Sequence, residues 1–337
     1  SYEVGLELRF FNDRLGFDFT YYNNDAEDQI LTLTVPGSSG FGAAIINAGN
    51  INSNGFELAM NVSPVRSSKF NWDIYLNAAT NTSTVEELAD GLDNRQLSSW
   101  GWGGLAVNAP VGGEWGQFTG RGYTYFNGDE SKPIINEDGS PVRTNNKNLG
   151  GLLPDWTGGF RNVIDFNNFS LSAFIEFQIG GQFHSVTRMF NAYSGLGAET
   201  VGNNDKGNPI RDPVSQGGGV RVDGVLADGT PHTVYVDPQT RYSDHLFAMN
   251  EEWMYDASYV KFRELSFGYN FPSKILGNTP IRSLKLSLIA RNLWLIHTNV
   301  DGLDPSEIPP GSSNYVFQEN GALPGVRSLG LNLRVGF

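Results

Sequence analysis

The sequence predicts an all-β fold, an antiparallel β-barrel that spans a membrane, and three observations carry this prediction. Apolar and polar residues alternate over strand-length segments, which is the pattern of strands with one face in lipid. No window approaches the roughly 18 consecutive apolar residues of a transmembrane helix, because charged and amide residues interrupt every apolar run. Glycine, at 41 residues, and aromatic residues, at 12%, are abundant and indicate many turns and ring anchors.

Composition and charge argue against several classes of function. The net charge of -13 disfavours a nucleic-acid partner, because phosphate binding needs a basic surface. With no cysteine, the sequence has no disulfide framework, no thiolate metal site and no cysteine nucleophile. The first residues are strand-like and do not resemble a signal peptide, so we expect a mature or internal start.

Four hairpins with short turns account for most of the alternating segments. They are predicted to join residues 2–10 to 15–21, 56–62 to 70–78, 156–166 to 169–179 and 265–271 to 284–290. In the first hairpin Leu6 and Leu8 face one way and Glu7 faces the other. After a tight turn the same apolar face resumes, as a hairpin requires.

One further strand ends the sequence on an aromatic residue. Its apolar residues are Leu329, Leu331, Leu333, Val335 and Phe337, which alternate with Gly330, Asn332, Arg334 and Gly336. A strand of that length with a final Phe looks like the closing strand of an outer-membrane barrel. We expect its apolar residues to act as the C-terminal signal for barrel assembly.

Long excursions rich in Gly, Asn, Asp and Pro separate the hairpins. They cover residues 24–53, 80–154, 180–255 and 296–325. Loops of that length count against a compact soluble domain, but outer-membrane barrels have short periplasmic turns and long extracellular loops. The alternation of strands then leaves the C-terminus on the short-turn side, which is the periplasm.

Aromatic residues gather where the predicted strands end. Those beside short turns or the terminus are Phe10, Phe11, Phe17, Phe70, Trp72, Phe166, Phe169, Tyr269, Phe271 and Phe337, and those near the long loops are Tyr21, Tyr22, Trp156 and Trp294. This clustering is typical of the aromatic girdles at the two membrane interfaces. The alternative, rings in the core of a β-sandwich, would spread them along the strands.

The polar faces of the strands carry many charges, which suits a wet or plugged lumen where they pair with one another. About nine strands cannot enclose such a lumen, and single-chain bacterial barrels have even strand counts. An open sheet would also leave unpaired edges in lipid. The sequence is therefore expected to be one part of a larger barrel.

Several segments resemble the SusC/RagA family of TonB-dependent outer-membrane transporters, in order from end to end. They are EVGLELRFFNDRLG at 3–16, NAGNI at 47–51, NGFEL at 54–58, FNWD at 70–73 with LN at 76–77, DASYVKFREL at 256–265 followed by GY at 268–269 and Pro272, ARNL at 290–293, DPSE at 304–307, and the ending from 327 to 337. The resemblance implies a 22-strand barrel around an N-terminal plug, of which residues 1–337 are the C-terminal segment.

The resemblance also implies a function and partners. Such transporters import glycans or peptides with a SusD-like surface lipoprotein as a lid, and TonB supplies energy by pulling on the plug. The partners expected here are the remaining N-terminal barrel and plug, the lid, TonB and outer-membrane lipid. The plug and the first strands are not among these residues, so the chain is expected to be one piece of a larger transporter.

Metal binding and catalysis have little support. Many family members carry a calcium-binding loop D-x-N-x-D-G before the strand at Trp156, but here residues 136–141 read NEDGSP, which favours a turn. The loop NNDKGN at 203–208 has oxygen ligands at suggestive spacing for Ca²⁺ but lacks a bidentate Glu. No cofactor is expected, apart from calcium in the extracellular loops.

A hydrolase is the weakest of the alternatives. The histidines at 184, 232, 245 and 297 lack the spacing of a helical zinc site. Ser185, His184 and Asp205 or Asp212 can be drawn as a triad, but sequence neighbours need not be neighbours in space. The protein is expected not to be an enzyme.

Ligand contacts are expected from aromatic residues outside the alternating strands, because exposed rings stack on sugars or pack on peptide side chains. These are Trp100, Trp102, Trp115, Tyr123, Tyr125 and Tyr193. They could equally hold the loops together or contact the lid. The function predicted is part of a TonB-dependent importer of glycans or peptides; the alternatives are an outer-membrane barrel enzyme and a soluble β-sandwich adhesin.

Overall fold

The computed structural model describes residues 1–34, 43–47, 49–277, 279–308, 318–321 and 323–337. Parts of the predicted loops 24–53 and 296–325 therefore lie outside the described residues. Among the residues that are described, no helix is both long and apolar enough to cross a membrane.

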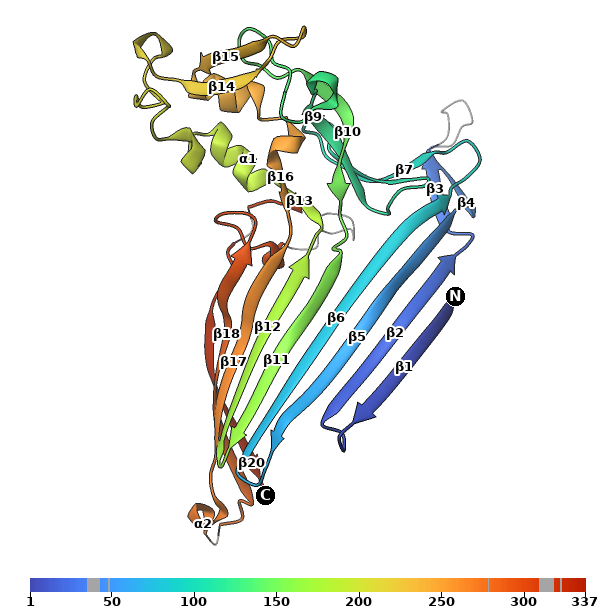
Figure 1. The fold of residues 1–337 in the computed structure, drawn as a ribbon, viewed down its shortest axis with the longest axis vertical. Helices are drawn as coiled ribbons and strands as arrows, with labels where there is room; N and C mark the ends of the chain where they lie inside the picture. The colour runs from blue at the N-terminus through green and yellow to red at the C-terminus, as the bar shows by residue number, and fades with distance from the viewer. Residues whose placement is uncertain (35–42, 48, 278, 309–317, 322) are drawn as a thin grey trace.

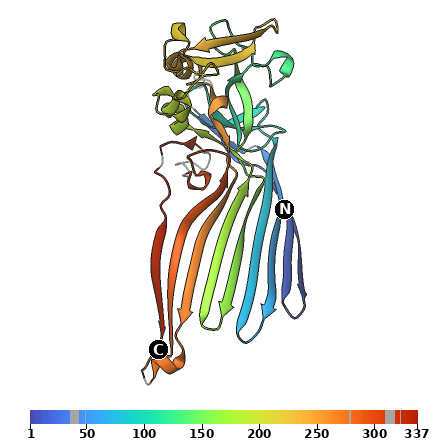
Figure 2. The same ribbon diagram turned by 60° about the vertical axis from the view of Figure 1, so that its left-hand side comes forward.

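A nine-stranded antiparallel sheet forms a tall curved wall, with strands in the order β1-β2-β5-β6-β11-β12-β17-β18-β20 (Figures 1 and 2). The strands are β1 (Tyr2–Phe10), β2 (Leu15–Ala26), β5 (Asn50–Arg66), β6 (Phe70–Glu87), β11 (Trp156–Phe166), β12 (Phe169–Ile179), β17 (Tyr259–Asn270), β18 (Ser283–Thr298) and β20 (Ser328–Gly336). Each strand pairs with its neighbour in chain order, so the four predicted hairpins and the further strand are confirmed.

The pairing register places one apolar face along the whole wall. Leu6 pairs with Phe19, which pairs with Leu58, at one end of the sheet. At the other end Leu265 pairs with Ala290, and Ala290 pairs with Leu329. Because side chains alternate between faces, the polar residues between these positions make up the opposite face. We call the apolar side the outer face and the polar side the inner face.

The outer face is uncovered in the described structure. Leu6, Leu288 and Leu331 have 53%, 50% and 76% of their surface exposed. A β-sandwich would bury this face against a second sheet, so the sandwich interpretation is wrong. The buried apolar residues lie instead mostly in the loops beyond the strands, in several small clusters.

Rings contact one another near the ends of the strands, as the girdle interpretation predicts. Near the short turns the ring centroids of Phe70 and Phe166 lie 6.4 Å apart, and those of Phe169 and Tyr269 lie 4.9 Å apart. Near the loops Tyr21 contacts Phe56 at 5.0 Å.

Tyr22 departs from this girdle, because it follows Tyr21 directly and therefore points to the inner face. It pairs with Glu3 and Gly55, and its hydroxyl donates to Asn81 Oδ1 at 3.0 Å. The expectation that Tyr22 belongs to the interface girdle was wrong.

Three strands, β5, β6 and β18, are much longer than the sequence pattern predicts, and β18 has 16 residues. β5 has 17 residues and β6 has 18, and their ladder continues through Asn54, Ser53 and Thr84 to the residues nearest the loops. Polar side chains cover both faces there, so the alternation that predicts a strand in lipid is absent. Backbone hydrogen bonding nevertheless carries the hairpin on, and the loop residues 88–155 start from its raised end (Figure 1).

The loops fold into a second layer above the wall (Figures 1 and 2). Its strands are β3 (Ile30–Thr34), β4 (Ala43–Asn47), β7 (Asn94–Ser99), β8 (Ala106–Pro110), β9 (Gln117–Tyr123), β10 (Arg143–Gly151), β13 (Gln182–Ser185), β14 (Val220–Val225), β15 (Pro231–Val236), β16 (Met254–Asp256) and β19 (Gln318–Glu319). They pair as β10-β9-β8-β7, β16-β13-β19, β14-β15 and β3-β4.

The helices are short. They are α1 (Val186–Tyr193), α2 (Ser273–Leu276), η2 (Phe126–Gly128), η3 (Ala198–Thr200), η4 (Val214–Gln216), η5 (Thr240–His245), η6 (Asn250–Trp253) and η7 (Pro305–Glu307). All but α2 and η7 belong to the loop layer. The turn η7 lies against β17 of the wall, and α2 lies in the turn between β17 and β18, at the end of the wall where the C-terminus also lies (Figure 1).

Candidate functional site

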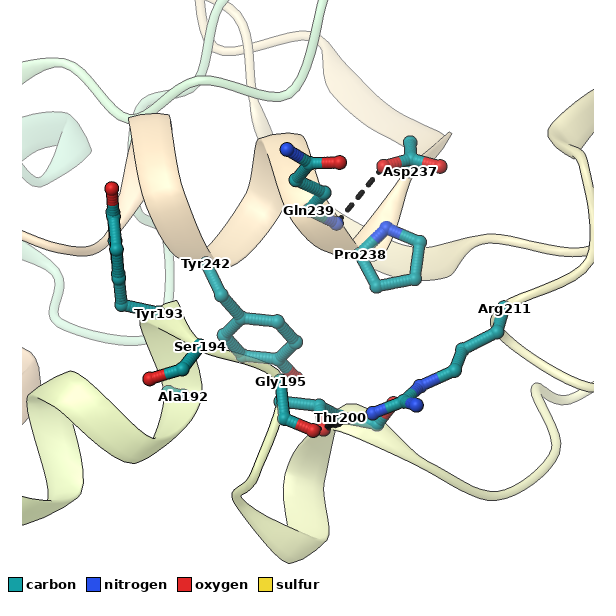
Figure 3. A pocket seen from close by; sticks show the side chains of 10 residues that line it. All are labelled: Ala192, Tyr193, Ser194, Gly195, Thr200, Arg211, Asp237, Pro238, Gln239 and Tyr242. Carbon is teal, nitrogen blue, oxygen red and sulfur yellow. Dashed lines mark hydrogen bonds between the residues drawn. The ribbon is translucent and has the colours of Figure 1, made fainter.

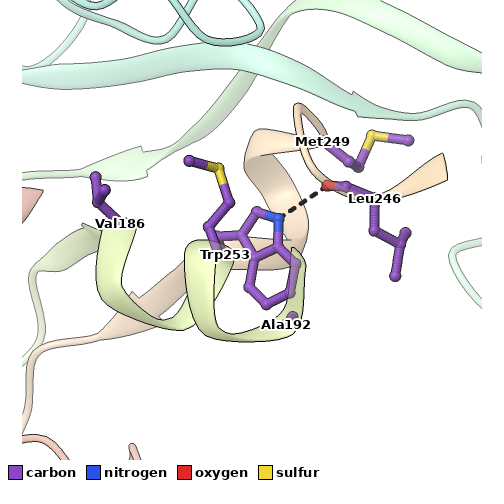
Figure 4. Packing of buried hydrophobic residues seen from close by; sticks show 6 residues of the cluster. Val186, Ala192, Leu246, Met249 and Trp253 are labelled. Atoms are coloured by element: carbon purple, nitrogen blue, oxygen red, sulfur yellow. Dashed lines mark hydrogen bonds between the residues drawn. The ribbon is translucent and has the colours of Figure 1, made fainter. Parts of the chain in front are cut away.

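The helix α1 is the centre of the loop layer's most extensive apolar cluster. Its side chains Val186, Met189 and Ala192 are buried, and they pack against Leu246, Met249 and Trp253 (Figure 4). The indole Nε1 of Trp253 donates to the backbone oxygen of Leu246 at 2.9 Å, so the buried ring nitrogen is satisfied. Two aromatic residues of α1, Phe190 and Tyr193, remain partly exposed.

Four rings form what we call the aromatic surface: Trp102, Phe190, Tyr193 and Phe247. Phe190 contacts Trp102 at 5.3 Å and Phe247 at 5.2 Å between ring centroids, and Tyr193 contacts Phe247 at 4.8 Å. Trp102 has 39% of its surface exposed and Tyr193 has 49%. Rings that contact one another and stay open to solvent are suited to pack against a ligand or a partner.

A cleft with a volume of about 390 Å³ adjoins this surface, and we call it the loop cleft (Figure 3). It is lined by Ala192, Tyr193, Ser194, Gly195, Thr200, Arg211, Asp237, Pro238, Gln239 and Tyr242. Tyr193 thus belongs to both the aromatic surface and the cleft. The end of α1, the segment that follows it and the start of η5 bring these residues together.

Charged groups in the cleft are engaged by the protein itself. Arg211 donates from Nε to the Thr200 oxygen at 2.8 Å and from Nη2 to the Gly195 oxygen at 2.6 Å. The Asp237 carboxylate accepts the backbone N–H of Gln239 at 2.9 Å. The cleft therefore presents aromatic rings together with polar and charged groups that the protein holds in place, which suits binding.

Tyr242 stays neutral in the cleft at physiological pH. Burial and the nearby Glu199 carboxylate raise the pKa of Tyr242, and the hydroxyl donates to the Glu199 backbone oxygen at 2.9 Å. Its ring is therefore available as an apolar contact with a polar tip.

Tyr123 and Tyr125 meet at a second place in the loop layer, where β9 approaches η6. The Tyr123 hydroxyl donates to Glu252 at 2.5 Å, and the Tyr125 hydroxyl donates to Glu251 Oε1 at 3.1 Å. Burial, followed by the charge of Glu251, raises the pKa of Tyr125 to about 12. Burial and Glu252 likewise raise the pKa of Tyr123. Both hydroxyls therefore serve as donors inside the loop layer.

Trp100 and Trp115 pack within the loops. Trp100 lies against the cluster that contains Leu105 and Phe118, and Trp115 lies against the cluster that contains Val85. The structure thus gathers Trp102 and Tyr193 into one exposed surface and distributes the other four predicted residues among packing positions. Phe190 and Phe247 were missed, although Phe190 lies three residues before Tyr193 and so shares a helix face with it.

The drawn triad does not assemble. Ser185 Oγ donates to Glu319 Oε2 at 2.6 Å, and Asp205 accepts the Tyr235 hydroxyl at 2.8 Å. His184 is 1% exposed, and burial lowers its pKa to about 4. Within the described residues no three His, Asp or Glu side chains lie together as a metal site would need.

The two segments considered for calcium are turns whose oxygens accept protein donors. In the turn at 136–141, Asp138 accepts Ser140 N at 2.8 Å, as the NEDGSP sequence predicts for a turn. In the loop at 203–208, Asn204 Oδ1 accepts Lys206 N at 3.0 Å, and Asp205 pairs with Arg221 at 3.1 Å.

Comparison with known proteins places the chain in a family. The model of the family described as TonB dependent receptor-like, beta-barrel matches residues 1–293. TonB-dependent receptors P3 and P26 of Formosa agariphila are 26% and 24% identical, over 98% and 100% of this chain. The matched region makes up 33% and 34% of those relatives, so the chain spans about a third of their length.

A shorter match links the chain to SusC, and solved structures share its fold. TonB-dependent receptor SusC of Bacteroides thetaiotaomicron is 25% identical over 28% of this chain and 10% of its own. The RagAB peptide transporter matches with a TM-score of 0.68 and 19% identity, over 99% of this chain and 35% of that one. The RagAB peptide importer in its open-open state matches with a TM-score of 0.69 and 17% identity, over 99% of this chain and 34% of that one.

The matched region includes seven of the wall's strands in full, most of β18 and most of the loop layer, and the shared fold extends over the rest. The chain therefore belongs to the TonB-dependent receptor-like β-barrel family, and its nine-stranded sheet is part of the wall of such a barrel.

Proposed function

We propose that this chain is the C-terminal part of the barrel of a SusC/RagA-like, TonB-dependent importer of glycans or peptides in the outer membrane. The remaining strands and an N-terminal plug would belong to the rest of the transporter. The chain spans about a third of its relatives' length, which supports this assignment.

The observation that carries the proposal is the two-faced wall. Its outer face is apolar from β1 to β20, and its inner face holds paired charges such as Arg263 with Glu176 at 2.6 Å. Lipid on one side and a polar passage on the other account for both faces. An adhesin would need neither.

Orientation follows from the lengths of the connections. The short turns and the C-terminus lie at one end of the wall, and the loop layer lies at the other (Figure 1). In outer-membrane barrels the short turns are periplasmic, so the loop layer would face the exterior and Phe337 the periplasm. The apolar residues of β20 would then serve as the barrel-assembly signal proposed from the sequence.

The aromatic surface and the loop cleft are where this chain would contact cargo or a SusD-like lid. TonB would act through the plug, outside these residues. The RagAB structures are named for a peptide transporter, which supports peptides as one of the two proposed cargo classes.

The test uses the full-length transporter in its own outer membrane. Deleting its gene should abolish accumulation of one class in a mixture of fluorescently labelled oligosaccharides and peptides, and a protonophore should do the same. Wild-type protein should fractionate with the outer membrane and migrate faster on a gel before heating than after. Unchanged accumulation of every labelled compound, or recovery in the soluble fraction, would contradict the proposal.

A further inference from the structure

The segment between β18 and β20, residues 299–327, connects two distant parts of the molecule, and we call it the strap. Its described residues are 299–308, 318–321 and 323–327. One part, which contains η7, lies against the inner face of the wall, and another part, β19, joins the loop layer. Each attachment is made by a buried charged side chain.

Lys261 makes the attachment to the wall. This lysine, on β17, has 2% of its surface exposed. Its Nζ donates to Asp304 Oδ2 at 2.7 Å, to Ser306 Oγ at 3.0 Å and to Glu307 Oε1 at 2.6 Å. All three N–H groups of the ammonium are used, so the buried charge is paired and saturated.

Arg263 extends this attachment to a second strand. Its Nη1 donates to Glu307 Oε1 at 3.1 Å, and its Nε donates to Glu176 Oε2 on β12 at 2.6 Å. The turn η7 is therefore tied across two neighbouring strands of the wall.

Glu319 makes the attachment to the loop layer. β19 pairs in parallel with β13, with His184 opposite Gln318 and Ser185 opposite Glu319. Glu319 is 4% exposed, and its carboxylate accepts the hydroxyls of Ser185 at 2.6 Å and Thr187 at 2.5 Å. These two residues lie at the start of α1.

The first turn of α1 is thus held by the strap at more than one point. Ser185 caps the helix by accepting Arg188 N at 3.1 Å. Arg188 in turn donates from Nη1 to the Asp301 backbone oxygen at 2.8 Å. Asp301 precedes η7 and Glu319 follows it, so both sides of the wall attachment lead to the same helical turn.

The other end of α1 carries Phe190 and Tyr193 and begins the loop cleft. The helix has eight residues, about 12 Å of rise, and helices that short are not stable alone. Its position depends on its buried face and on what binds its ends. A shift of Asp301 or Glu319 would therefore move the first turn of α1 and, through the helix, the rings of the aromatic surface.

We propose that Lys261 and Glu319 are positioning residues: through the strap they set the place of α1, and so couple the inner wall of the barrel to the aromatic surface and loop cleft. A change at the inner face that displaces Lys261 would loosen the aromatic surface and the loop cleft. Binding at the aromatic surface or in the loop cleft would in turn stabilise the contacts of Asp301 and Glu319 with α1. The inference concerns coupling within the chain and holds whichever cargo the transporter carries.

The test measures hydrogen exchange of backbone amides in the full-length protein, without ligand. In Lys261→Met, amides of 299–308 and of α1 should exchange about tenfold faster or more, because removing one partner of a buried pair leaves its carboxylates uncompensated. Glu319→Leu should accelerate exchange in α1 to a similar extent. Faster gel migration before heating identifies barrels that have still assembled.

Arg291→Met is the matched control. Arg291 lies on the adjacent strand β18 and pairs with Glu264 at 2.9 Å, but its side chain is 63% exposed and its partner is in the wall. This variant should leave exchange in α1 unchanged. A cross-link between Arg188→Cys and Asp301→Cys, made with a bifunctional maleimide, should restore protection of α1 in Lys261→Met. Residues 1–337 contain no cysteine, and any cysteine elsewhere in the full-length protein is first replaced by serine.

Three results would overturn the inference. Lys261→Met could accelerate exchange in 299–308 and leave α1 protected, which would mean that the apolar cluster alone holds the helix. Arg291→Met could loosen α1 as much as Lys261→Met does. The cross-link could fail to restore protection. None of these results depends on import, so they are separate from failure of the proposed function.

Discussion

Lys147 reaches Glu251 with 2.7 Å between Nζ and Oε1, and the same nitrogen lies 4.4 Å from the centroid of the Tyr125 ring. Glu251 also accepts Tyr123 N at 2.7 Å, and both side chains of the ion pair are 24% exposed. This carboxylate therefore joins η6 to both β9 and β10, which precede it by more than a hundred residues in sequence.

Removing that carboxylate should loosen the loop layer. Glu251→Ala leaves Lys147 without its partner and Tyr123 N without an acceptor, at a cost of about 2–3 kcal/mol. Hydrogen exchange should accelerate in β9 and β10. Lys132→Ala breaks an ion pair whose side chains are 53% and 42% exposed, so its effect should be within about 0.5 kcal/mol. Equal effects would show that Glu251 has no joining role.

Alkaline pH should destabilise the same region. The pKa of Tyr125 is about 12 in the folded protein, against 10.0 ordinarily, because burial and Glu251 disfavour its phenolate. The contribution of protonated Tyr125 to the free energy of unfolding is complete below pH 10 and is lost between pH 10 and 12, because Tyr125 releases its proton at lower pH in the unfolded state. Ultraviolet titration should show several late-ionising tyrosines, and Tyr125→Phe should remove one of them. A titration unchanged by Tyr125→Phe would contradict this.

Acid should weaken the attachment of the strap to the loop layer. Burial lowers the pKa of His184 to about 4 from 6.5, so the folded state binds its proton later than the unfolded state does. The contribution of neutral His184 to the free energy of unfolding is complete above pH 6.5 and decreases by about 3 kcal/mol as pH falls toward 4. Exchange in β13 should accelerate over that range in wild type. His184→Phe should flatten the pH dependence, and a slope that persists would assign it to other groups.

The two faces of β20 should respond oppositely to charge. Leu331→Arg places a cation on the outer face, which costs about 2–4 kcal/mol near the middle of a bilayer. Asn332→Arg places the same residue on the inner face and should be tolerated. The amount of heat-modifiable protein in the outer membrane measures both. Spin labels at Leu6, Leu286 and Leu331 should also report hydrocarbon, and labels that report water would contradict the assignment of the faces.

Truncating rings should separate recognition from packing. Tyr193→Ala and Trp102→Ala should reduce cargo accumulation while leaving the protein's level in the membrane unchanged, because both side chains are partly exposed. Trp100→Ala should lower that level, because its ring packs against the cluster of Leu105 and Phe118. Loss of accumulation in Trp100→Ala alone would reverse the assignment.

The wall could be predicted from sequence because lipid imposes a strict period of two. That period places Leu6, Phe19 and Leu58 in one row, and the structure pairs them so. The prediction failed where lipid ends: in β5 and β6 the residues toward the loops are polar on both faces, so no alternation marks them as strand. Tyr22 was misplaced because its position near the girdle was given more weight than the rule that neighbouring residues of a strand face opposite sides.

The site depends on contacts that no local pattern reveals. Trp102 and Phe247 are far apart in sequence, yet their ring centroids lie 6.4 Å apart, and Phe190 of α1 contacts both rings. Of the six loop aromatics chosen from sequence, nothing distinguished Tyr193, which is exposed, from Trp115, which packs beside Val85. Lys261 and Asp304 lie in segments that carry the family resemblance, but their ion pair follows only from how the strap folds back.

The raised β5–β6 hairpin holds the segment 88–155 away from the part of the wall that faces lipid. A bilayer needs about 9–11 residues per strand, whereas these strands have 17 and 18, so about seven residues of each stand clear of the lipid. The segment 88–155 therefore begins at the end of a hydrogen-bonded hairpin that extends beyond the lipid. Exchanging that segment between relatives should change what is captured without disturbing how the barrel inserts, which makes this hairpin a natural splice point for chimaeric receptors.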